Sequence, residues 1–325
     1  MNKLYPLKLK GCSKSAIWGG NILSEKYNKL THDDNIGESW ELTCRDKERN
    51  LIENGPFAGK TINEFIKTYG DTVVGSNFKG GRFPLLIKLL NSASPLSVQV
   101  HPDDEYALKN ENEYGKTEMW YIMEADEDSE LVIGVKNYDK EAFRIAAKNG
   151  NLESFLGRVK VKPGDCFFIP AGLVHAIGKG ILLCEVQQNS DVTYRVYDYN
   201  RKDANGDLRE LHLESALDVI REYTSDEVNA LAHTSAPITP VSKNAETLIA
   251  CEKFAVEKVK VTSSDILTCD MTSFLSLTFT KGEGSIVYNS EDYSFKAGET
   301  YYIPAGLGEF SVNGDAEIIC ASIKQ

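Results

Sequence analysis

A histidine that is present in one copy of an internal repeat and absent from the other is the first residue that indicates chemistry. The first copy spans residues 162–175 and ends in His175, and the second spans residues 296–309 and ends in Glu309. Both copies share a lysine, a glycine, an acidic residue, two aromatic residues and Ile-Pro-Ala-Gly-Leu at a constant offset. Repeated sequence indicates repeated structural units, so the shared residues are those that a strand and its turn require. His175 is not shared, and we identify it as a candidate ligand.

A short stretch upstream of His175 places three polar side chains on one face of a predicted strand. Three apolar residues alternate there with Ser97, Gln99 and His101, which is the pattern of a strand with one apolar and one polar face. A proline and three acidic residues follow at positions 102–105, and these suit the first turn of a helix. We therefore expect the strand to end just after His101.

Two further predicted strands present charged side chains. In residues 115–123, alternation puts Lys116 and Glu118 on the same face. In residues 191–201, strict alternation puts Arg195 on a face with a threonine and two tyrosines. An alternating strand can instead place such an arginine in a surface ion pair, so spacing alone assigns it no role.

The rest of the chain consists mostly of short apolar stretches separated by turns that contain proline and glycine. Together with the repeat, these stretches predict a mainly β protein built from two β-barrels of jelly-roll type, with a few short helices. Residues 235–240 read Ser-Ala-Pro-Ile-Thr-Pro, a composition typical of a linker. We predict an N-terminal catalytic domain with helical insertions over residues 1–236. A C-terminal domain that ends in the degenerate repeat is predicted over residues 241–325.

Length and composition limit the class of protein. A length of 325 residues suggests about two domains of roughly 150 residues each. The hydrophobic content of 42% and charged content of 26% are ordinary for a globular protein. No apolar run approaches the roughly 18 residues that a membrane span needs, so we expect no membrane partner.

Charge and cysteine usage narrow the expected partners and compartment. The formal net charge of −12 argues against a nucleic-acid partner, because phosphate backbones are bound by clustered basic residues. An anionic substrate would therefore be met by a few local cations. The seven cysteines are scattered without a Cys-x-x-Cys pair, as expected for reduced thiols. The first residues lack the apolar core of a secretory signal, so we expect a cytoplasmic protein.

The first copy of the repeat resembles a motif of the cupins, whose metal lies inside the barrel. The spacing is Gly-x5-Pro-x-Gly-x2-His, and its residues are Gly164, Pro170, Gly172 and His175. The other cupin motif supplies two ligands two residues apart on a strand and a glutamate further on. Gln99, His101 and Glu118 can occupy those places. This chain departs from that motif because Gln99 stands where cupins have a histidine, and because an insertion separates His101 from Glu118.

Four segments together resemble type I mannose-6-phosphate isomerases, in their compact bacterial form. They are residues 95–103, 116–120, 170–175 and 194–198. In that family the matching Gln, His, Glu and His hold one zinc ion, and the matching Arg and Lys act on the substrate. The resemblance therefore implies Gln99, His101, Glu118 and His175 as zinc ligands, and Arg195 and Lys116 as catalytic residues. Many longer members have His-Lys-Pro-Glu where this chain has Gly-Lys-Thr-Glu, so a role of that extra histidine cannot be transferred.

The resemblance implies an enzyme of carbohydrate metabolism with a zinc-dependent aldose–ketose isomerase activity. Its reaction would interconvert mannose 6-phosphate and fructose 6-phosphate. Imidazole, carboxylate and amide oxygen ligands suit zinc, and the reaction transfers a proton between adjacent carbons through an enediol or enediolate. Arg195 can stabilise the developing anion but is a poor base. The general base stays open between a neutral Lys116, a metal-bound water, Glu38 and Glu41.

For the phosphate group of the sugar phosphate substrate, Ser97 and Lys88 are the predicted contacts. We expect a monomer or a weak homodimer. Two other functions remain open: a metal-dependent cupin oxidase or dioxygenase, and a non-catalytic sugar-binding cupin. The ligand Gln99 and the Arg195 segment count against the oxidase. The non-catalytic cupin would be expected to lose ligands in both repeats, and only the second has lost its histidine.

Overall fold

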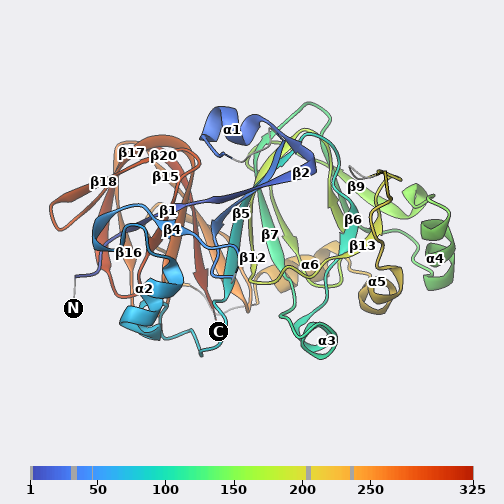
Figure 1. The fold of residues 1–325 in the computed structure, drawn as a ribbon, viewed down its shortest axis with the longest axis horizontal. Helices are drawn as coiled ribbons and strands as arrows, with labels where there is room; N and C mark the ends of the chain where they lie inside the picture. The colour runs from blue at the N-terminus through green and yellow to red at the C-terminus, as the bar shows by residue number, and fades with distance from the viewer. Residues whose placement is uncertain (1–2, 31–34, 46, 203–205, 235–237, 325) are drawn as a thin grey trace.

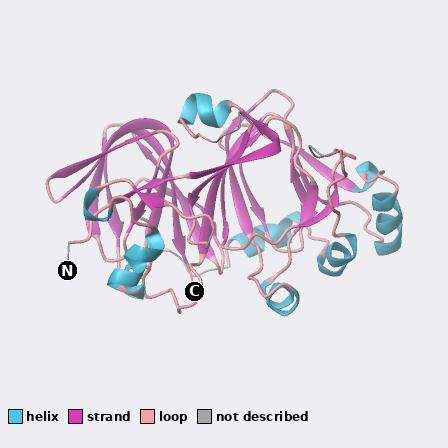
Figure 2. Ribbon diagram, viewed as in Figure 1, coloured by secondary structure: helices cyan, strands magenta, loops and turns pink. Residues whose placement is uncertain are grey.

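The computed structural model describes residues 3–30, 35–45, 47–202, 206–234 and 238–324. Its strands form three antiparallel sheets, and its helices lie around them (Figures 1 and 2). The prediction of a mainly β protein with a few short helices is confirmed. No helix among the described residues is long and apolar enough to cross a membrane.

Two of the sheets build the N-terminal barrel, and they lie opposite each other in Figure 1. In spatial order, the six-stranded sheet consists of β10 (Cys166–Ile169), β7 (Glu118–Ala125), β12 (Ile181–Gln188), β5 (Leu85–Ser92), β3 (Ile36–Leu42) and β2 (Cys12–Gly20). The five-stranded sheet consists of β13 (Tyr194–Tyr197), β6 (Val98–Val100), β11 (His175–Ile177), β8 (Glu130–Val135) and β9 (Leu156–Lys160).

The third sheet forms the C-terminal part of the fold. Its path is β14 (Ala245–Ala250), β15 (Phe254–Val261), β20 (Gly308–Ile323), β17 (Leu275–Tyr288), β19 (Thr300–Ile303), β1 (Leu7–Lys10) and β4 (Leu51–Ile52). Two more strands, β16 (Ser264–Cys269) and β18 (Glu291–Lys296), pair with β20 and β17 respectively. The β19 strand lies within the second copy of the repeat, as β10 lies within the first.

The start of the chain is part of the C-terminal sheet, because β1 pairs with β19. Strand β4 then pairs with β1. The predicted division into residues 1–236 and 241–325 stays a proposal. Two strands of the first range, β1 and β4, pair into the C-terminal sheet. Of the predicted linker, residues 235–237 lie outside the described part of the chain.

Short helices connect or flank the strands. The α-helices are α1 (Ile22–Tyr27), α2 (Ile62–Tyr69), α3 (Asp104–Asn110), α4 (Lys140–Lys148), α5 (Leu213–Val219) and α6 (Ser225–Ala232). The 3-10 turns are η1 (Gly55–Phe57), η2 (Asp71–Val73) and η3 (Glu153–Phe155). The α4 helix belongs to the helical insertion expected before the repeat, and the side chain of Asp139 caps its N-terminus by accepting from the Ala142 N–H.

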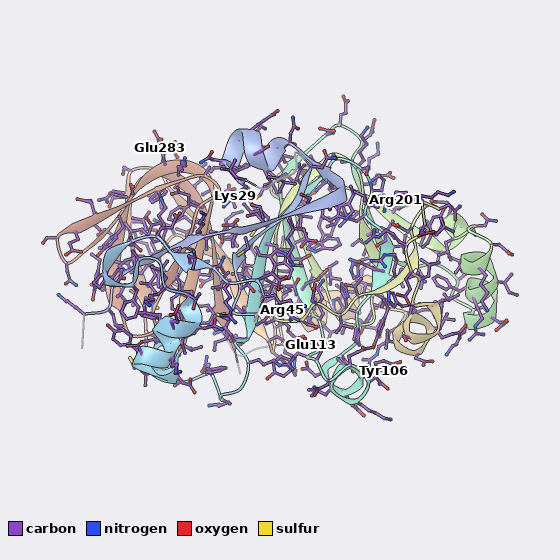
Figure 3. The ribbon with its side chains drawn as sticks, in the orientation of Figure 1. Lys29, Arg45, Tyr106, Glu113, Arg201 and Glu283 are labelled. Atoms are coloured by element: carbon purple, nitrogen blue, oxygen red, sulfur yellow. The ribbon has the colours of Figure 1, made fainter. Side chains whose placement is uncertain are left out.

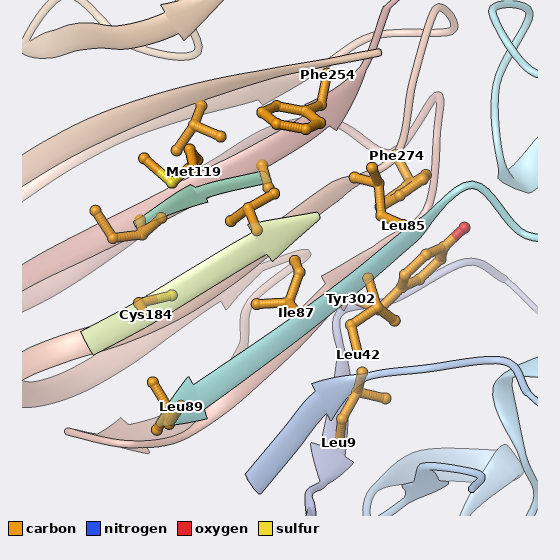
Figure 4. Packing of buried hydrophobic residues seen from close by; sticks show 14 of the residues in the cluster. Leu9, Leu42, Leu85, Ile87, Leu89, Met119, Cys184, Phe254, Phe274 and Tyr302 are labelled. Atoms are coloured by element: carbon orange, nitrogen blue, oxygen red, sulfur yellow. The ribbon is translucent and has the colours of Figure 1, made fainter. Parts of the chain in front are cut away.

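The six-stranded sheet packs one face against the C-terminal sheet. Alternate residues of β5, including Leu85, Ile87 and Leu89, join a buried cluster with residues of the C-terminal sheet such as Phe254 and Tyr302 (Figure 4). Because side chains alternate across a strand, the residues between these on β5 point into the N-terminal barrel. Both faces of the sheet are therefore covered, and every residue of β5 is buried.

Two of the predicted strands are shorter than the alternation of their sequences suggests. The β7 strand begins at Glu118, so Lys116 precedes it in an irregular segment. The β13 strand covers only part of residues 191–201, and its pairing with β6 is irregular between Arg195 and Tyr197. The alternation of polar and apolar residues indicates which face of a strand a side chain lies on. It does not indicate whether the backbone forms hydrogen bonds with a neighbouring strand, which is why both strands are shorter than predicted.

Candidate active site

Three side chains from three different strands meet inside the N-terminal barrel. His101 follows β6, Glu118 begins β7 and His175 begins β11. Their ligand atoms lie within 4.8 Å of one another, and all three residues are buried. The two histidine Nε2 atoms are 3.1 Å apart. Glu118 Oε2 lies 3.6 Å from Nε2 of His101, and Oε1 lies 3.4 Å from Nε2 of His175.

Backbone carbonyl groups fix the orientation of both imidazoles. Nδ1 of His101 donates to the Val192 carbonyl oxygen at 2.9 Å. Nδ1 of His175 donates to the Leu173 carbonyl oxygen at 2.8 Å. A carbonyl oxygen only accepts, so each Nδ1 carries the proton and each neutral ring has its lone pair on Nε2. Both lone pairs are thus on the atoms that face Glu118, in an arrangement typical of metal-binding histidines.

Burial favours the neutral form of both histidines. Removal from water lowers the pKa of His175 to about 4. It also lowers the pKa of His101 well below the usual value, and the nearby Lys116 and His175 lower it further. Neutral imidazole is the form that binds a metal ion, so these rings need not lose a proton near neutral pH.

The Glu118 carboxylate is buried and has an ion-pair partner on one side only. Its side chain is 0% exposed, and Lys116 Nζ lies 3.0 Å from Oε2. Neither oxygen accepts a hydrogen bond of good geometry from the described residues. A buried carboxylate needs such pairing or a metal ion, and here the imidazoles face it as well. With the two imidazoles it forms a mixed nitrogen and oxygen donor set that fits a metal ion such as zinc.

Gln99, the fourth predicted ligand, lies beside this cluster. It pairs with His175 between β6 and β11, and its side-chain Nε2 lies 3.4 Å from the His175 Nε2. A half-turn of the amide group exchanges its nitrogen and oxygen, which would turn the carbonyl oxygen towards the cluster. The structure thus brings together the four residues that the sequence nominates as ligands.

A cavity of about 320 Å³ adjoins the cluster. Lining residues that the sequence predicts are Lys88, Ser97, Gln99, Lys116 and Arg195. Lys116 connects the cavity to the cluster, because its Nζ is 3.1 Å from the His101 Nε2. The lining is mainly polar and charged, which suits a substrate that carries hydroxyl and anionic groups.

Arg195 is held in place on the cavity wall. Its Nε donates to the Ser97 Oγ at 3.3 Å, and its Nη1 donates to the Glu210 carbonyl oxygen at 2.8 Å. The β13–β6 pairing sets Arg195 opposite Gln99. Burial is the main cause that lowers the pKa of Arg195, and the nearby Arg209 lowers it further. A guanidinium stays protonated despite such effects, so the site has a fixed positive charge close to the predicted ligands.

Lys88 is surrounded by acidic and aromatic side chains in the same cavity. Its Nζ lies 3.4 Å from a carboxylate oxygen of Glu38 and 3.4 Å from one of Glu185, and 5.0 Å from the centroid of the Trp40 ring. Burial opposes the charge of this ammonium, but the two carboxylates outweigh burial and raise the pKa of Lys88. Its charge therefore already has two anionic partners in the protein.

The two glutamates considered as general bases point to opposite faces of β3. Glu38 lines the cavity. Glu41 instead forms an ion pair with Lys29 at 2.7 Å and accepts a hydrogen bond from Ser39 Oγ at 2.6 Å. Glu41 is absent from the lining of the cavity, so it is not placed to act on a substrate there.

Three charged residues of the cavity were not nominated from the sequence: Glu185, Asp191 and Arg209. Glu185 could have been found, because it is the one charged residue in the apolar stretch 181–186. Asp191 is the first residue of the predicted strand that carries Arg195, but aspartate is also common in turns, so its type alone does not indicate a site. Arg209 has no motif around it, so only the fold shows that it belongs here.

A larger cavity of about 740 Å³ lies elsewhere, and the two cavities share only Asp191 as a lining residue. Its lining residues fall between Cys44 and Asp191, and they include Arg45 and Glu113, which are labelled in Figure 3. Those two residues form an ion pair at 3.0 Å. None of the proposed ligands lines this cavity, so we place the chemistry in the smaller one.

The second barrel has no equivalent of the ligand cluster among the described residues. Glu309, the counterpart of His175, lies on β20 and is exposed. A packed apolar core occupies the region between the strands of this barrel. In that core, the rings of Phe279 and Phe295 stack with centroids 3.7 Å apart. The second copy of the repeat thus keeps the strand and turn without a polar cavity.

Two family models match the chain. Residues 7–145 match the family described as phosphomannose isomerase type I, catalytic domain. Residues 244–323 match the mannose-6-phosphate isomerase cupin domain. The second match identifies the C-terminal barrel as a cupin domain, so the prediction that its fold is of this type is confirmed.

Curated relatives cover the chain almost end to end. The chain is 40% identical to the mannose-6-phosphate isomerase ManA of Bacillus subtilis, with 98% of this chain and 99% of the relative aligned. It is 35% identical to a mannose-6-phosphate isomerase of Streptococcus mutans, with 97% and 98% aligned.

Solved structures show the same architecture. The crystal structure of the mannose 6-phosphate isomerase from Bacillus subtilis superposes with a TM-score of 0.85 at 34% identity, and covers 97% of this chain and 99% of its own. A structure from Archaeoglobus fulgidus superposes with a TM-score of 0.78 over 99% of each chain. Its identity of 21% supports the fold alone.

We predict that the two histidines of the cluster are needed for metal binding and that their repeat counterpart is not. His101→Ala and His175→Ala should each lose most of the bound zinc after loading and desalting, because each removes an Nε2 lone pair from the cluster. Glu309→Ala should retain zinc at the wild-type ratio. Metal content measured by inductively coupled plasma spectrometry tests this, and equal loss in all three variants would contradict the assignment.

We predict that the metal-free protein becomes less stable as pH falls below about 6.5. The unfolded chain takes up a proton on His175 near pH 6.5, whereas burial holds its folded-state pKa at about 4. Between pH 7 and 5 this one group should remove about 2 kcal/mol of unfolding free energy. Urea unfolding of chelator-treated protein at both pH values measures the loss. His175→Gln should show a smaller loss than wild type, and an identical pH dependence would contradict this cause.

Proposed function

The chain belongs to the type I mannose-6-phosphate isomerases, and from this premise we propose a zinc-dependent interconversion of mannose 6-phosphate and fructose 6-phosphate. We assign one zinc ion to Gln99, His101, Glu118 and His175. The observation that carries this proposal is the convergence of the buried Glu118 carboxylate with two imidazole lone pairs that backbone carbonyl groups hold in place. When bound there, zinc supplies a Lewis acid beside the oxygens of the sugar.

Lys116 is the residue to which we assign the proton transfer. The reaction must move a proton between two adjacent carbons of the open-chain sugar, and this requires a group that can hold a proton beside both. Lys116 Nζ lies on the cavity wall, 3.1 Å from the His101 Nε2 and 3.0 Å from the Glu118 Oε2. In its neutral form this amine can accept the proton from one carbon and return it to the other.

Arg195 is the residue to which we assign stabilisation of the negative charge. Removal of the carbon-bound proton leaves an enediolate, whose oxygens need a preorganised positive group. The hydrogen bonds from Arg195 to Ser97 and Glu210 hold the guanidinium before the substrate arrives. No reorganisation is then needed when the charge develops.

For the phosphate we propose Ser97, Arg195 and Arg209, which line the same cavity. Arg209 uses Nη1 for one carboxylate, Asp198, and a guanidinium has further N–H donors for an anionic ligand. Lys88, predicted as a phosphate contact, we reassign to the sugar hydroxyl groups, because two carboxylates, Glu38 and Glu185, already share its charge.

An assay of the purified chain tests the function and the need for metal together. We predict that it converts mannose 6-phosphate to fructose 6-phosphate in a coupled assay, that chelation abolishes the conversion and that added zinc restores it. Full activity in metal-free protein would refute the zinc proposal. No isomerisation by fully zinc-loaded protein would refute the isomerase itself and favour the alternative of a non-catalytic sugar-binding cupin.

We predict that Arg195→Ala lowers kcat by about 100- to 1000-fold, the typical cost of removing one preorganised group that stabilises a transition-state charge. KM should change less, and zinc content should stay at the wild-type value because Arg195 is not a proposed ligand. Arg195→Lys should recover part of the rate, since an ammonium lacks the planar fork of a guanidinium. Steady-state kinetics measures all three, and a near-normal kcat in Arg195→Ala would show that the residue only forms surface contacts.

A further inference from the structure

The segment that carries Lys116 is not part of a strand, so its position depends on individual hydrogen bonds. This segment, residues 114–117, lies between α3 and β7. The Lys116 N–H donates to the Pro102 carbonyl oxygen at 3.0 Å. Ser190 Oγ donates to the Tyr114 carbonyl oxygen at 2.7 Å. Further contacts come from two side chains outside the segment.

Asp104 and Gln188 hold the backbone on both sides of Lys116. Asp104 Oδ1 accepts from the Gly115 N–H at 2.8 Å, and Gln188 Oε1 accepts from the Thr117 N–H at 3.0 Å. The two side chains are joined, because Gln188 Nε2 also donates to Asp104 Oδ1 at 3.0 Å. Lys116 therefore lies between two backbone N–H groups, those of Gly115 and Thr117. Their acceptors, Asp104 and Gln188, are hydrogen-bonded to each other.

The Gly115 backbone is pressed against the start of α3. A Cβ atom at this position would lie 2.4 Å from the carbonyl carbon of Asp103 and 2.4 Å from the nitrogen of Asp104. Such distances are too short for any side chain. The close approach lets the Asp104 carboxylate reach the Gly115 N–H, and it leaves no space here for the histidine of longer family members.

The third member of this group comes from the C-terminal barrel. Lys253 lies between β14 and β15, and its Nζ is 2.7 Å from the Asp104 Oδ2. Burial raises the pKa of the Asp104 carboxyl, but Lys253, the Gly115 N–H and Gln188 together outweigh burial and lower it. Asp104 is thus ionised near neutral pH. Its Oδ2 contacts Lys253 of the second barrel, and its Oδ1 accepts the hydrogen bond from Gly115 in the Lys116 segment.

We propose that Asp104 and Gln188 are positioning residues for Lys116, and that Lys253 makes the C-terminal barrel part of this support. The proposal rests on the proposed function, in which Lys116 transfers the proton. It gives the second barrel, which has no ligand cluster among the described residues, a part in catalysis that does not require a site of its own.

The strand pairing of Glu118 makes the proposal separable from metal binding. Glu118 pairs with Ile169 of β10 and with Gln187 of β12, so its position does not depend on Asp104. Loss of Asp104 should therefore displace Lys116 and leave the proposed ligands in place. Because a displacement of about 1 Å can cost about 100-fold in rate, a change far from the substrate can be seen in turnover.

The experiment measures kcat, KM, zinc content and melting temperature of the full-length, zinc-loaded enzyme. We expect Asp104→Ala to lower kcat by about 10- to 100-fold, with zinc content unchanged and KM changed less than kcat. Lys253→Ala removes only a partly exposed ion pair, so its kcat should fall by up to about fivefold. Lys253→Arg, which keeps the charge, should restore the rate, and Lys253→Ala should have no further effect in the Asp104→Ala background.

Lys258→Ala is the matched control. Lys258 also forms a lysine–carboxylate pair at 2.7 Å, but its partner Glu246 belongs to the same C-terminal barrel. This variant should keep the wild-type kcat. The proposal is overturned if Lys253→Ala has the same kcat as Lys258→Ala, a comparison that stands even if Asp104→Ala fails to fold. It is also overturned if Asp104→Ala loses zinc in proportion to activity. Wild-type isomerase activity is unaffected by either result, so the proposed function is judged separately.

Discussion

The six-stranded sheet of the N-terminal barrel is covered on both faces, and the rest of the site depends on this constraint. Its outer face packs against the C-terminal sheet, and the outward side chains of β5, β7 and β12 in this contact include Ile87, Met119 and Val186. Strand geometry sends their immediate neighbours to the interior. Those neighbours include Lys88, Glu118 and Glu185, so one alternation builds the core between the barrels and the charged wall of the cavity.

Charges buried in such a wall are tolerated only if they compensate one another. Lys88 lies between two carboxylates, and Glu185 also accepts a hydrogen bond from the Trp120 Nε1 at 2.9 Å. Burial and the neighbouring Glu118 raise the pKa of Glu185, while Lys88 opposes that effect. Glu118 has Lys116 as its ion-pair partner at 3.0 Å. Its oxygens also face the Nε2 atoms of His101 and His175, so a carboxylate and two imidazole lone pairs converge at this point of the wall.

Much of this arrangement was predictable from the sequence, because it follows from periodicity and repetition. Alternation placed Ser97, Gln99 and His101 on one polar face, and the repeat separated His175 from residues that the fold requires. Contacts between distant segments were not predictable in the same way. The pairing of β1 with β19 joins the start of the chain to the second barrel, and no local pattern records it. Arg209 also lines the cavity only because the fold brings distant segments together, and no motif around it indicates this position.

The two copies of the repeat show how one strand-and-turn unit can serve two purposes. Both copies use Pro-x-Gly to bend the chain after an aromatic strand, and in both the glycine has a positive φ, 90° at Gly172 and 77° at Gly306. Such a backbone favours glycine whatever surrounds it, so the turn is retained where the ligand is lost. The interior of the second barrel is filled by stacked rings such as Phe279 and Phe295, so Glu309 has no ligand cluster to join. The outer face of the second barrel packs against the six-stranded sheet of the first barrel. The second copy of the repeat therefore keeps the strand and turn that shape this contact, although it holds no ligand.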